Sequence, residues 1–484
     1  MQAERLDGAS LTIGGLVAIS SGRCGVEVDP GALRRVGTSN ALLQHARAHG
    51  AVYGANTGVG ANRHERASDE ERGLRLLRSH CAAVGPIEDD ITARAAMTVR
   101  LNQILAGGSG ISPRVAEALA EALHDGAVPT IHSWGAIGTA DLAALAELGL
   151  TLAGERPWQN GKGPVTTIDA TDALPLISSS ALTVATAALA LQRVQSQLRA
   201  SVVVAALSFL ALRGNPEAYE VSVHRNRAHP GQVEVARLMS RLVAGCAAPV
   251  RIQDPFGLRV LPQVTAPAIH AARTLDDVLR EEINAAVENP LVTTEGVRHH
   301  GQFHTATLAS SLDAARGAFL PVLSLSTARL GLLMRPDLTG LRAFLASGPA
   351  GSSGLMISEY VVQDLLTEIR VGMTPTAAGT LSISLGLEEH ASFATQGARS
   401  LRTMTQLAPT LLAAELVAAV RALRMAPGRL TVGPLREAFE MAHELLDPAE
   451  EDRPLGPDLE RAADLLPQLG AVLDYSSMGL SSSA

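Results

Sequence analysis

Lysine is almost absent from this sequence. Lys162 is the single lysine among 40 basic residues, so arginine carries nearly all of the positive charge, a bias typical of genomic codon usage. Acidic residues outnumber basic ones, and the formal net charge is −8. Bulk electrostatics therefore give no reason to expect a nucleic-acid partner.

Cysteine is scarce as well. Cys24, Cys81 and Cys246 are odd in number and widely spaced, which predicts neither a disulfide framework nor a metal site and favours a reducing compartment. The N-terminus lacks the charged-then-apolar pattern of a signal peptide. The most apolar runs, such as residues 200–212, fall short of the roughly 18 residues that span a bilayer. We expect a soluble, cytoplasmic protein with no membrane partner.

What the sequence does contain is apolar helix-forming residues. Apolar residues make up 46% of the chain and charged residues 18%, which indicates a large buried core. Residues 114–126 repeat apolar side chains at helical spacing and close on Gly126, a residue suited to a helix C-terminus. The segments 186–212 and 266–286 are longer and more apolar than usual helices. Such helices bury more than one face, which predicts a bundle and packing between subunits.

Strand signals are few, and residues 10–20 carry the best of them. We predict three regions along the chain. Residues 1–185 form a mixed N-terminal region with a lid loop, residues 186–407 a central long-helix bundle, and residues 408–484 a helical segment with breaks at 447–458.

A glycine-rich stretch, "YGANTGVG", occupies residues 53–60. No Lys-Ser or Lys-Thr pair follows Gly60, so a phosphate-binding loop is disfavoured. Glycines give a loop the backbone freedom that a lid needs, and Tyr53 can act as an acid or base where its surroundings lower its pKa. A surface turn with a packed tyrosine is the alternative.

Three further segments carry candidate site residues. His80 in "RSHCAAVGP" is either a pocket residue or a structural histidine. In "RIQDPFGLRVLPQ", Arg259 can hold a carboxylate through a bidentate fork, beside Gln253, or form an ion pair with Asp254 that packs helices. In "LGLEEHASF", Glu388 and its neighbour either tune one another for acid–base work or lie on a solvated helix face.

Together these segments resemble the histidine and aromatic amino-acid ammonia-lyase family, over nearly the whole chain and in the family's order. The resemblance is carried by "YGANTGVG", "RSHCAAVG", "VPTIHSWGAIGTADLAALAELGL", "HPGQ", "QDPFGLRVLPQ", "ENPLV", "FHTATLA", "SGLMI" and "EEH". It implies a mainly α fold, a long-helix bundle of the ammonia-lyase/fumarase-like type with a small mixed N-terminal region. It also implies a homotetramer with active sites shared between subunits.

In this family an Ala-Ser-Gly triplet cyclises and dehydrates to methylidene-imidazolone, an electrophile that helps expel ammonia from an α-amino acid. The triplet precedes an Asp-Leu-Ala sequence, and here the corresponding positions are Gly138, Thr139 and Ala140, before Asp141. Glycine at the third position permits the tight backbone approach of cyclisation, whereas Ala140 adds a Cβ there. Thr139 can still dehydrate in principle, to a methyl-substituted variant.

Two more positions depart from the family pattern. Phe256 replaces the tyrosine of the family's "QDAYSLR", and Ser178 falls near the asparagine that hydrogen-bonds the cyclised group. The resemblance implies that the chain retains the family's lid tyrosine as Tyr53, a pocket histidine as His80, and Glu388. It also implies that Arg259, with Gln253, binds the substrate carboxylate. In the family the position of His80 favours a histidine- or tyrosine-like side chain.

Three hypotheses follow. The first is a lyase-like enzyme that acts on a small carboxylate-bearing amino acid or derivative without the electrophile, by elimination, addition, cyclisation or isomerisation. The second is a true histidine- or tyrosine-type ammonia-lyase with a group derived from Thr139. The third is a catalytically silent binding or regulatory homologue, against which the retained Tyr53 argues.

For the first hypothesis we expect Arg259 to hold a carboxylate while Tyr53 removes a proton from the carbon next to the leaving group. Glu388 is a second acid or base, or binds an amine, and His80 orients the distal part of the substrate. The sequence shows no metal-ligand spacing and no nucleotide fingerprint, so no added cofactor is expected.

Overall fold

The structure is a computed structural model that describes residues 3–66, 71–227, 229, 231–430 and 433–472. Pro230 of the "HPGQ" motif and the end of the predicted C-terminal segment lie outside these residues. By internal contacts the chain forms two compact units, each assembled from three stretches. Unit 1 is Met1–Ala190, Asp276–Asp313 and Pro375–Arg399, and unit 2 is Leu191–Leu275, Ala314–Thr374 and Ser400–Ala484. The three continuous regions expected from the sequence remain a prediction.

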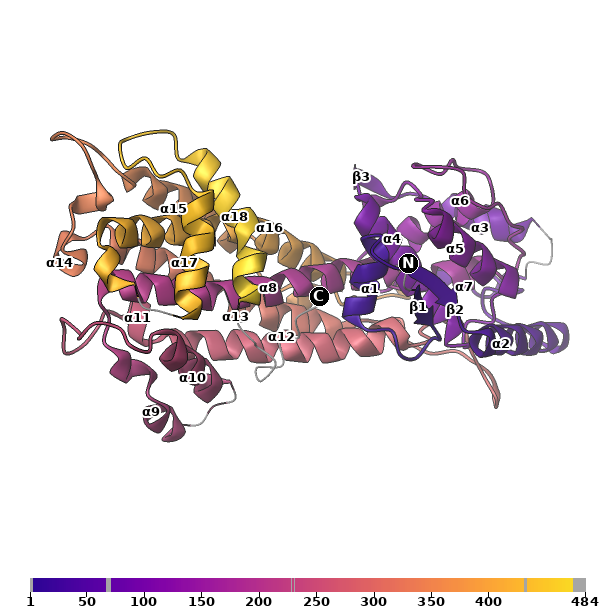
Figure 1. Cartoon of the computed structure of the whole chain (residues 1–484). Helices are drawn as coiled ribbons and strands as arrows, with labels where there is room; N and C mark the ends of the chain where they lie inside the picture. The colour runs from indigo at the N-terminus through magenta and orange to yellow at the C-terminus, as the bar shows by residue number, and fades with distance from the viewer. Residues whose placement is uncertain (1–2, 67–70, 228, 230, 431–432, 473–484) are drawn as a thin grey trace. The chain divides into compact units, whose positions relative to one another are not determined.

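The predicted mainly α fold is confirmed (Figure 1). Unit 1 contains α1 (Ile13–Ser20), α2 (Pro30–His49), α3 (Arg72–His80), α4 (Asp90–Leu105), α5 (Pro113–Asp125), α6 (Leu142–Leu152) and α7 (Ala173–Ile177). Unit 2 contains α9 (Val221–Arg225), α10 (Gln232–Leu242), α11 (Phe256–Arg259), α14 (Pro336–Thr339), α15 (Met356–Val371), α17 (Pro434–Leu445) and α18 (Gly456–Ala471). Four long helices contain residues of both units: α8 (Ala181–Leu212), α12 (Leu261–Asn284), α13 (Ala306–Leu333) and α16 (Ala394–Met425).

The predicted helices are present with shifted ends. Helix α5 stops before Gly126, whose φ of 70° is the left-handed conformation expected of a helix cap. Helix α8 includes the apolar segment predicted as a long helix, and α12 begins before the predicted segment and ends two residues earlier. Long uninterrupted periodicity therefore located the bundle helices correctly.

The strand predicted at residues 10–20 is wrong, because most of it forms α1. The Thr12 hydroxyl accepts a hydrogen bond from the Gly15 amide at 3.0 Å and caps the helix. Helix α1 packs on α4 and is buried on most of its surface, so its apolar residues show neither a helical nor a strand period.

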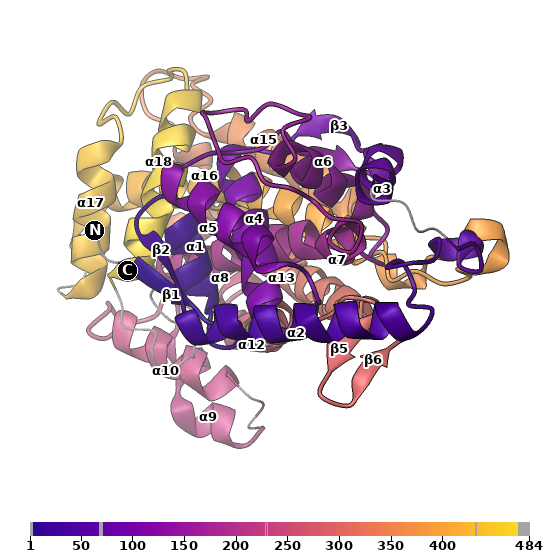
Figure 2. The ribbon, with the colours of Figure 1, turned by 90° about the vertical axis from the view of Figure 1, so that its right-hand side faces the viewer.

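Among the residues that the structure describes, short strands form three two-stranded sheets, all in unit 1. The strands β1 (Ala3–Leu6) and β2 (Gly25–Val28) are parallel, with Ala3 opposite Gly25. The strands β3 (Val84–Ile87) and β4 (His132–Trp134) are antiparallel, as are β5 (Leu291–Thr293) and β6 (Gly296–Arg298). Figure 2 shows the β5–β6 hairpin beside α2.

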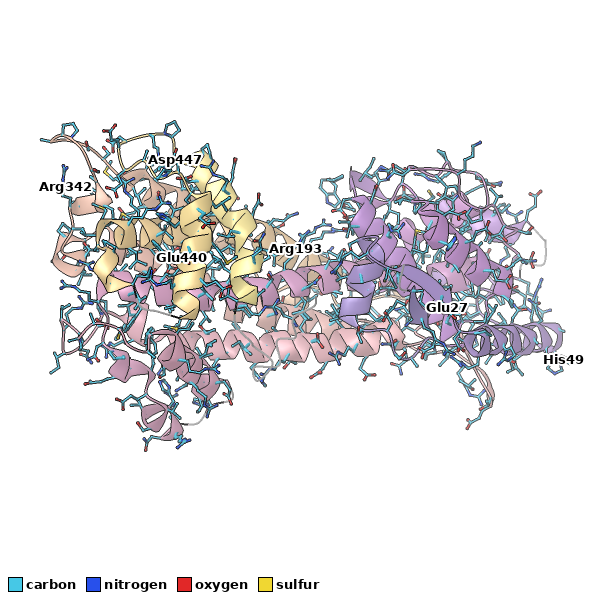
Figure 3. The ribbon with its side chains drawn as sticks, in the orientation of Figure 1. Glu27, His49, Arg193, Arg342, Glu440 and Asp447 are labelled. Carbon is cyan, nitrogen blue, oxygen red and sulfur yellow. The ribbon has the colours of Figure 1, made fainter. Side chains whose placement is uncertain are left out.

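Two apolar helical stretches, Ala173–Leu212 and Ala394–Met425, are long and apolar enough to cross a membrane by length and composition, so the statement that the apolar runs fall short of a membrane span is corrected. Their most apolar windows are 94% and 78% buried within the structure, as in the core helices of a bundle. Titratable side chains such as Glu27, His49, Arg342 and Glu440 are exposed instead (Figure 3).

A buried ion pair fixes the polar centre of unit 1. The Arg100 guanidinium lies 2.6 Å from the Glu288 carboxylate, and both side chains are fully buried. Arg100 also donates to the carbonyls of Pro175 at 2.7 Å and Leu176 at 3.0 Å, at the end of α7. A buried ion is unfavourable without partners, so Arg100 holds Glu288 and the end of α7 together.

Unit 2 has an equivalent centre. Glu415 on α16 accepts hydrogen bonds from Arg329 at 2.6 and 2.8 Å, and from Ser208 and Ser326. Arg329 also donates to the Gly257 carbonyl at 3.3 Å and thereby fixes the short helix α11.

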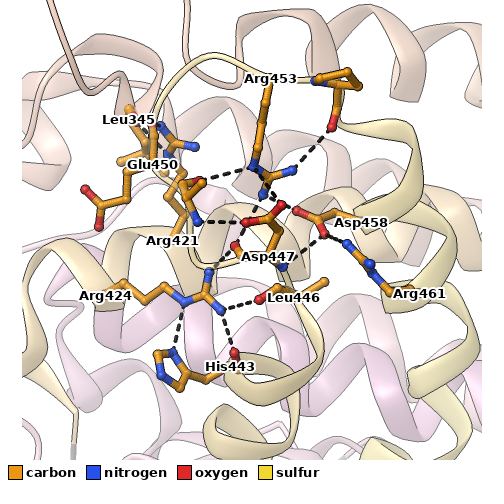
Figure 4. Close-up of polar contacts among 12 residues, drawn as sticks. Leu345, Arg421, Arg424, His443, Leu446, Asp447, Glu450, Arg453, Asp458 and Arg461 are labelled. Carbon is orange, nitrogen blue, oxygen red and sulfur yellow. Dashed lines mark hydrogen bonds and ion pairs between the residues drawn. The ribbon is translucent and has the colours of Figure 1, made fainter.

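A cluster of arginines fastens the connection between α17 and α18 (Figure 4). Arg424 on α16 donates to the carbonyls of Asp447 at 2.7 Å and Leu446 at 2.9 Å. Arg453 and Arg461 both donate to the carboxylate of Asp458. These bonds satisfy the cations internally, so the cluster is structural.

Candidate active site

A cavity of about 770 Å³ lies in unit 1. Segments far apart in the sequence build its wall: the loop at 51–64, the end of α3, the altered triplet, the end of α7 and two later loops. The lining includes six of the predicted site residues, namely Tyr53, His80, Thr139, Ala140, Ser178 and Glu388.

Tyr53 is held by its own loop. Its phenolic oxygen accepts a hydrogen bond from the Gly60 amide at 2.7 Å, and its ring meets the His299 ring edge-on, with 6.3 Å between centroids. Burial raises the pKa of Tyr53, and the nearby Glu388 carboxylate adds to this, whereas the Gly60 amide and Arg63 oppose it. Within one chain the surroundings thus keep Tyr53 a neutral phenol, contrary to the lowered pKa that a resting base needs.

Glu388 lies in a loop rather than on a helix, so the solvated helix face is excluded for it. The Ile383 amide donates to the Glu388 carbonyl at 3.0 Å and closes this loop. The Ser384 hydroxyl accepts from the Ala61 amide at 3.1 Å, which fastens the Glu388 loop to the loop that carries Tyr53. The two candidate acid–base groups are therefore positioned together.

His80 is the last residue of α3. Its Nδ1 lies 2.9 Å from the Leu76 carbonyl oxygen, which can only accept, so Nδ1 carries the proton. His80 also lines the cavity. The contact with Leu76 meets the structural interpretation of His80, and its role as a pocket residue remains a prediction.

The altered triplet forms part of the cavity wall. Thr139 is half-buried and lines the cavity, while Gly138 lies beneath it. Gly138 has a φ of +81°, and a Cβ there would lie 2.1 Å from the Ser392 hydroxyl and 2.7 Å from the Ala394 amide nitrogen. Backbone crowding at this distance restricts the position to glycine. Ala140 has a φ of +94°, a conformation that favours glycine, and is buried.

Asp141 anchors the end of this segment. Its amide donates to the Ser179 carbonyl, and its carboxylate accepts from the Thr183 amide and hydroxyl, each at 2.8 Å. Burial raises the pKa of Asp141 to about 6. Ser178, at the end of α7, accepts from the Asn289 amide at 3.2 Å.

The structure does not bring every predicted residue into this cavity. Gln253, Phe256 and Arg259 belong to unit 2 and are absent from the cavity lining. Asp254 pairs with Arg251 at 2.9 Å, so the alternative ion pair between Asp254 and Arg259 is wrong. The Arg259 guanidinium instead lies over the Phe256 ring, 4.5 Å from its centroid, and has no carboxylate partner among the residues that the structure describes.

Sequence reasoning missed several lining residues, including Arg63, His64, Asn289, His299 and Phe303. Asn289 belongs to "ENPLV" and Phe303 to "FHTATLA", so both lie in family-like phrases to which no role was assigned. The backbone amide of Asn289 lies beside the Ser178 hydroxyl, and its side-chain oxygen accepts from the His300 amide at 3.1 Å.

Comparisons with known proteins agree with this architecture. A family model described as aromatic amino acid lyase matches residues 11–444. Histidine ammonia-lyase of Symbiobacterium thermophilum is 32% identical over 494 residues, covering 96% of this chain and 97% of that protein. Histidine ammonia-lyase from Trypanosoma cruzi has a TM-score of 0.90 at 27% identity, covering 100% and 98% of the two chains. Tyrosine aminomutase from Streptomyces globisporus has a TM-score of 0.90 at 25% identity, covering 98% of each chain.

Proposed function

Since the chain belongs to the aromatic amino acid lyase family and is a lyase-like enzyme, we propose that it acts on a small carboxylate-bearing amino acid or derivative without a methylidene-imidazolone group. The observation that carries this proposal is the backbone around the triplet. Its first position tolerates only glycine, and its third holds an alanine in a conformation that favours glycine.

These residues do not fit the cyclised group. Its formation needs the Ala140 amide nitrogen to reach the Gly138 carbonyl carbon, and the alanine Cβ adds bulk at that point. The family asparagine that would hydrogen-bond the group is replaced by Ser178, whose hydroxyl accepts from a backbone amide. We therefore route no step through this group.

The chain's own residues support a proton transfer. We assign Tyr53 as the base that removes the proton on the carbon next to the leaving group. We assign Glu388 either to bind the substrate amine or to act as acid or base on the departing group. Removal of that proton forms the new carbon–carbon double bond as the leaving group departs with its electron pair. His80 Nε2 accepts a hydrogen bond from a ring N–H or O–H, which suits a histidine- or tyrosine-like side chain.

Assembly into an oligomer would supply the carboxylate-binding residues that the cavity of a single chain lacks. The family resemblance implies a homotetramer with shared sites, in which Arg259, Gln253 and Phe256 of another subunit complete the cavity. A cation beside Tyr53 lowers the pKa of its phenol, which burial raises in the single chain. Arg259 at the shared site would thus both hold the carboxylate and activate the base.

The test is a matched set of substrates. Histidine and tyrosine are compared with analogues in which an acyloxy group replaces the α-amino group, and the α,β-unsaturated acid is measured. We expect product only from the analogues, with a requirement for Tyr53. Efficient ammonia release from either amino acid would indicate a group derived from Thr139, and binding without turnover would indicate a silent homologue.

A further inference from the structure

Two buried hydroxyl groups converge on the Gly138 carbonyl oxygen. The Ser392 hydroxyl donates to it at 2.7 Å and the Thr305 hydroxyl at 3.0 Å, and the two hydroxyl oxygens are 2.9 Å apart. Each hydroxyl has one proton and a carbonyl oxygen has two lone pairs, so both can donate at once. Both side chains are 3% exposed, which removes water as a competing partner.

Neighbouring contacts keep the two hydroxyl-bearing segments in place. His304, adjacent to Thr305, lies with its Nε2 2.9 Å from Nδ1 of His390. The Phe393 amide, next to Ser392, donates to the Ile137 carbonyl at 2.8 Å. Segments from three parts of unit 1 are thus joined at the peptide group that precedes Thr139.

We infer that Thr305 and Ser392 form a hydroxyl clamp that holds the uncyclised Gly138 carbonyl and positions the Thr139 side chain in the cavity. Neither residue has a role in the proposed reaction so far, and both act through Gly138, so they are positioning residues. The inference rests on the proposed function, because it assumes that the triplet keeps its ordinary backbone.

The chemistry of the triplet supports this assignment. Cyclisation and dehydration would expel the Gly138 oxygen as water, and the clamp would lose its acceptor. One hydroxyl could then donate to the other across 2.9 Å, but the second hydroxyl proton and the Thr305 amide, which donates to the same carbonyl at 3.4 Å, would lose their acceptor. Buried donors without an acceptor are unfavourable, so the clamp matches the uncyclised chain. Thr139 itself has no hydrogen-bond partner among the residues described here, which leaves its hydroxyl available to a ligand in the cavity.

The test uses hydrogen exchange of the full-length protein, followed by mass spectrometry of peptides covering residues 136–142 and 391–395. Thr305→Val removes one hydroxyl at constant shape, and we expect the Asp141 and Phe393 amides to exchange about five- to tenfold faster, as for the loss of one hydrogen bond. Thr305→Ser keeps the hydroxyl and should restore the wild-type exchange.

Thr151→Val is the matched control. The Thr151 hydroxyl is buried in the same unit and donates to the Glu147 carbonyl at 2.8 Å, so it hydrogen-bonds neither Gly138 nor the partners of Asp141. If Thr305→Val and Thr151→Val change the exchange of the Asp141 and Phe393 amides equally, the clamp is refuted. Ser392→Ala provides a second variant should Thr305→Val fail to fold, with the same expected direction.

A kinetic readout separates positioning from mere stability. With any substrate that is turned over, Thr305→Val should lower kcat about tenfold with KM unchanged, and Thr305→Ser should rescue it. Equal kcat in Thr305→Val and wild type would contradict the inference. The mass of the wild-type triplet, measured on the same samples, tests the proposed function separately: loss of two waters contradicts that function, whereas an unmodified mass with no effect of Thr305→Val overturns only the clamp.

Discussion

The phenolic oxygen of Tyr53 accepts a hydrogen bond from the Gly60 amide at 2.7 Å. The candidate base therefore closes the glycine-rich loop that carries it. Ionisation strengthens this bond, because a phenolate is a better acceptor than a phenol. Closure of the loop and activation of Tyr53 thus favour one another.

Tyr53→Phe should abolish proton transfer. We expect kcat to fall by about 10² to 10⁴, the usual contribution of a positioned acid or base, in steady-state assays with a turned-over substrate. Tyr360→Phe, an exposed change on α15, should leave kcat unaltered. Tyr53→Phe with wild-type kcat would remove the base assignment.

Arg259 should control substrate affinity. Arg259→Lys loses both the planar fork and the stacking on Phe256, so we expect KM to rise about 10- to 100-fold with little change in kcat. Phe256→Tyr keeps the stacking and should be nearly neutral, whereas Phe256→Leu should raise KM. Arg225→Lys, an exposed change on α9, is the control. An unchanged KM in Arg259→Lys would show that the carboxylate is held elsewhere.

Ala140→Gly should stabilise the protein. An L-residue at a φ of +94° is strained by about 1–2 kcal/mol, and the extra chain entropy of glycine offsets part of the gain, so about 0.5–1 kcal/mol should remain in the free energy of unfolding. Ala136→Gly, in the same segment but without a positive φ, should destabilise by a similar amount. Denaturant titration measures the free energy of unfolding of both variants. An equal loss of stability in Ala140→Gly and Ala136→Gly would argue against strain at Ala140.

Asp141 predicts a pH dependence with a defined sign. Its folded-state pKa of about 6 lies above the ordinary 3.8, so folding favours the protonated form. The stability that this group contributes is present below about pH 4 and is lost as the pH rises through about 6, a change of about 3 kcal/mol. Asp141→Asn has no carboxyl group at this position and should not show this pH-dependent loss of stability. Denaturation at pH 4.5 and 7.5 should show the wild type losing stability relative to Asp141→Asn, and a constant difference would contradict the burial effect.

The apolar periodicity of the sequence was sufficient to predict the long helices of the bundle. Short motifs were sufficient to predict some of the residues that line the cavity. Helices α5 and α8 follow uninterrupted apolar patterns, which tertiary packing reinforces. Tyr53, His80 and Glu388 stand in recognisable phrases, and the structure brings them to one cavity.

Other features depend on contacts that no local pattern encodes. Helix α1 is apolar on most faces, so only the Thr12 cap distinguishes it from a strand. Thr305 and Ser392 are short hydroxyl side chains whose role depends on Gly138, more than 160 residues away for each. Asp254 pairs with Arg251, three residues earlier, rather than with Arg259, and the sequence alone does not distinguish these two partners.

The most direct test of the account is the mass of the purified protein and of a peptide spanning residues 126–156, with Thr139→Ala as the control. We predict the unmodified mass for the wild-type peptide, because the Gly138–Thr139–Ala140 backbone remains intact. A wild-type peptide lighter by two waters, with Thr139→Ala retaining them, would contradict the account and return the protein to ammonia-lyase chemistry.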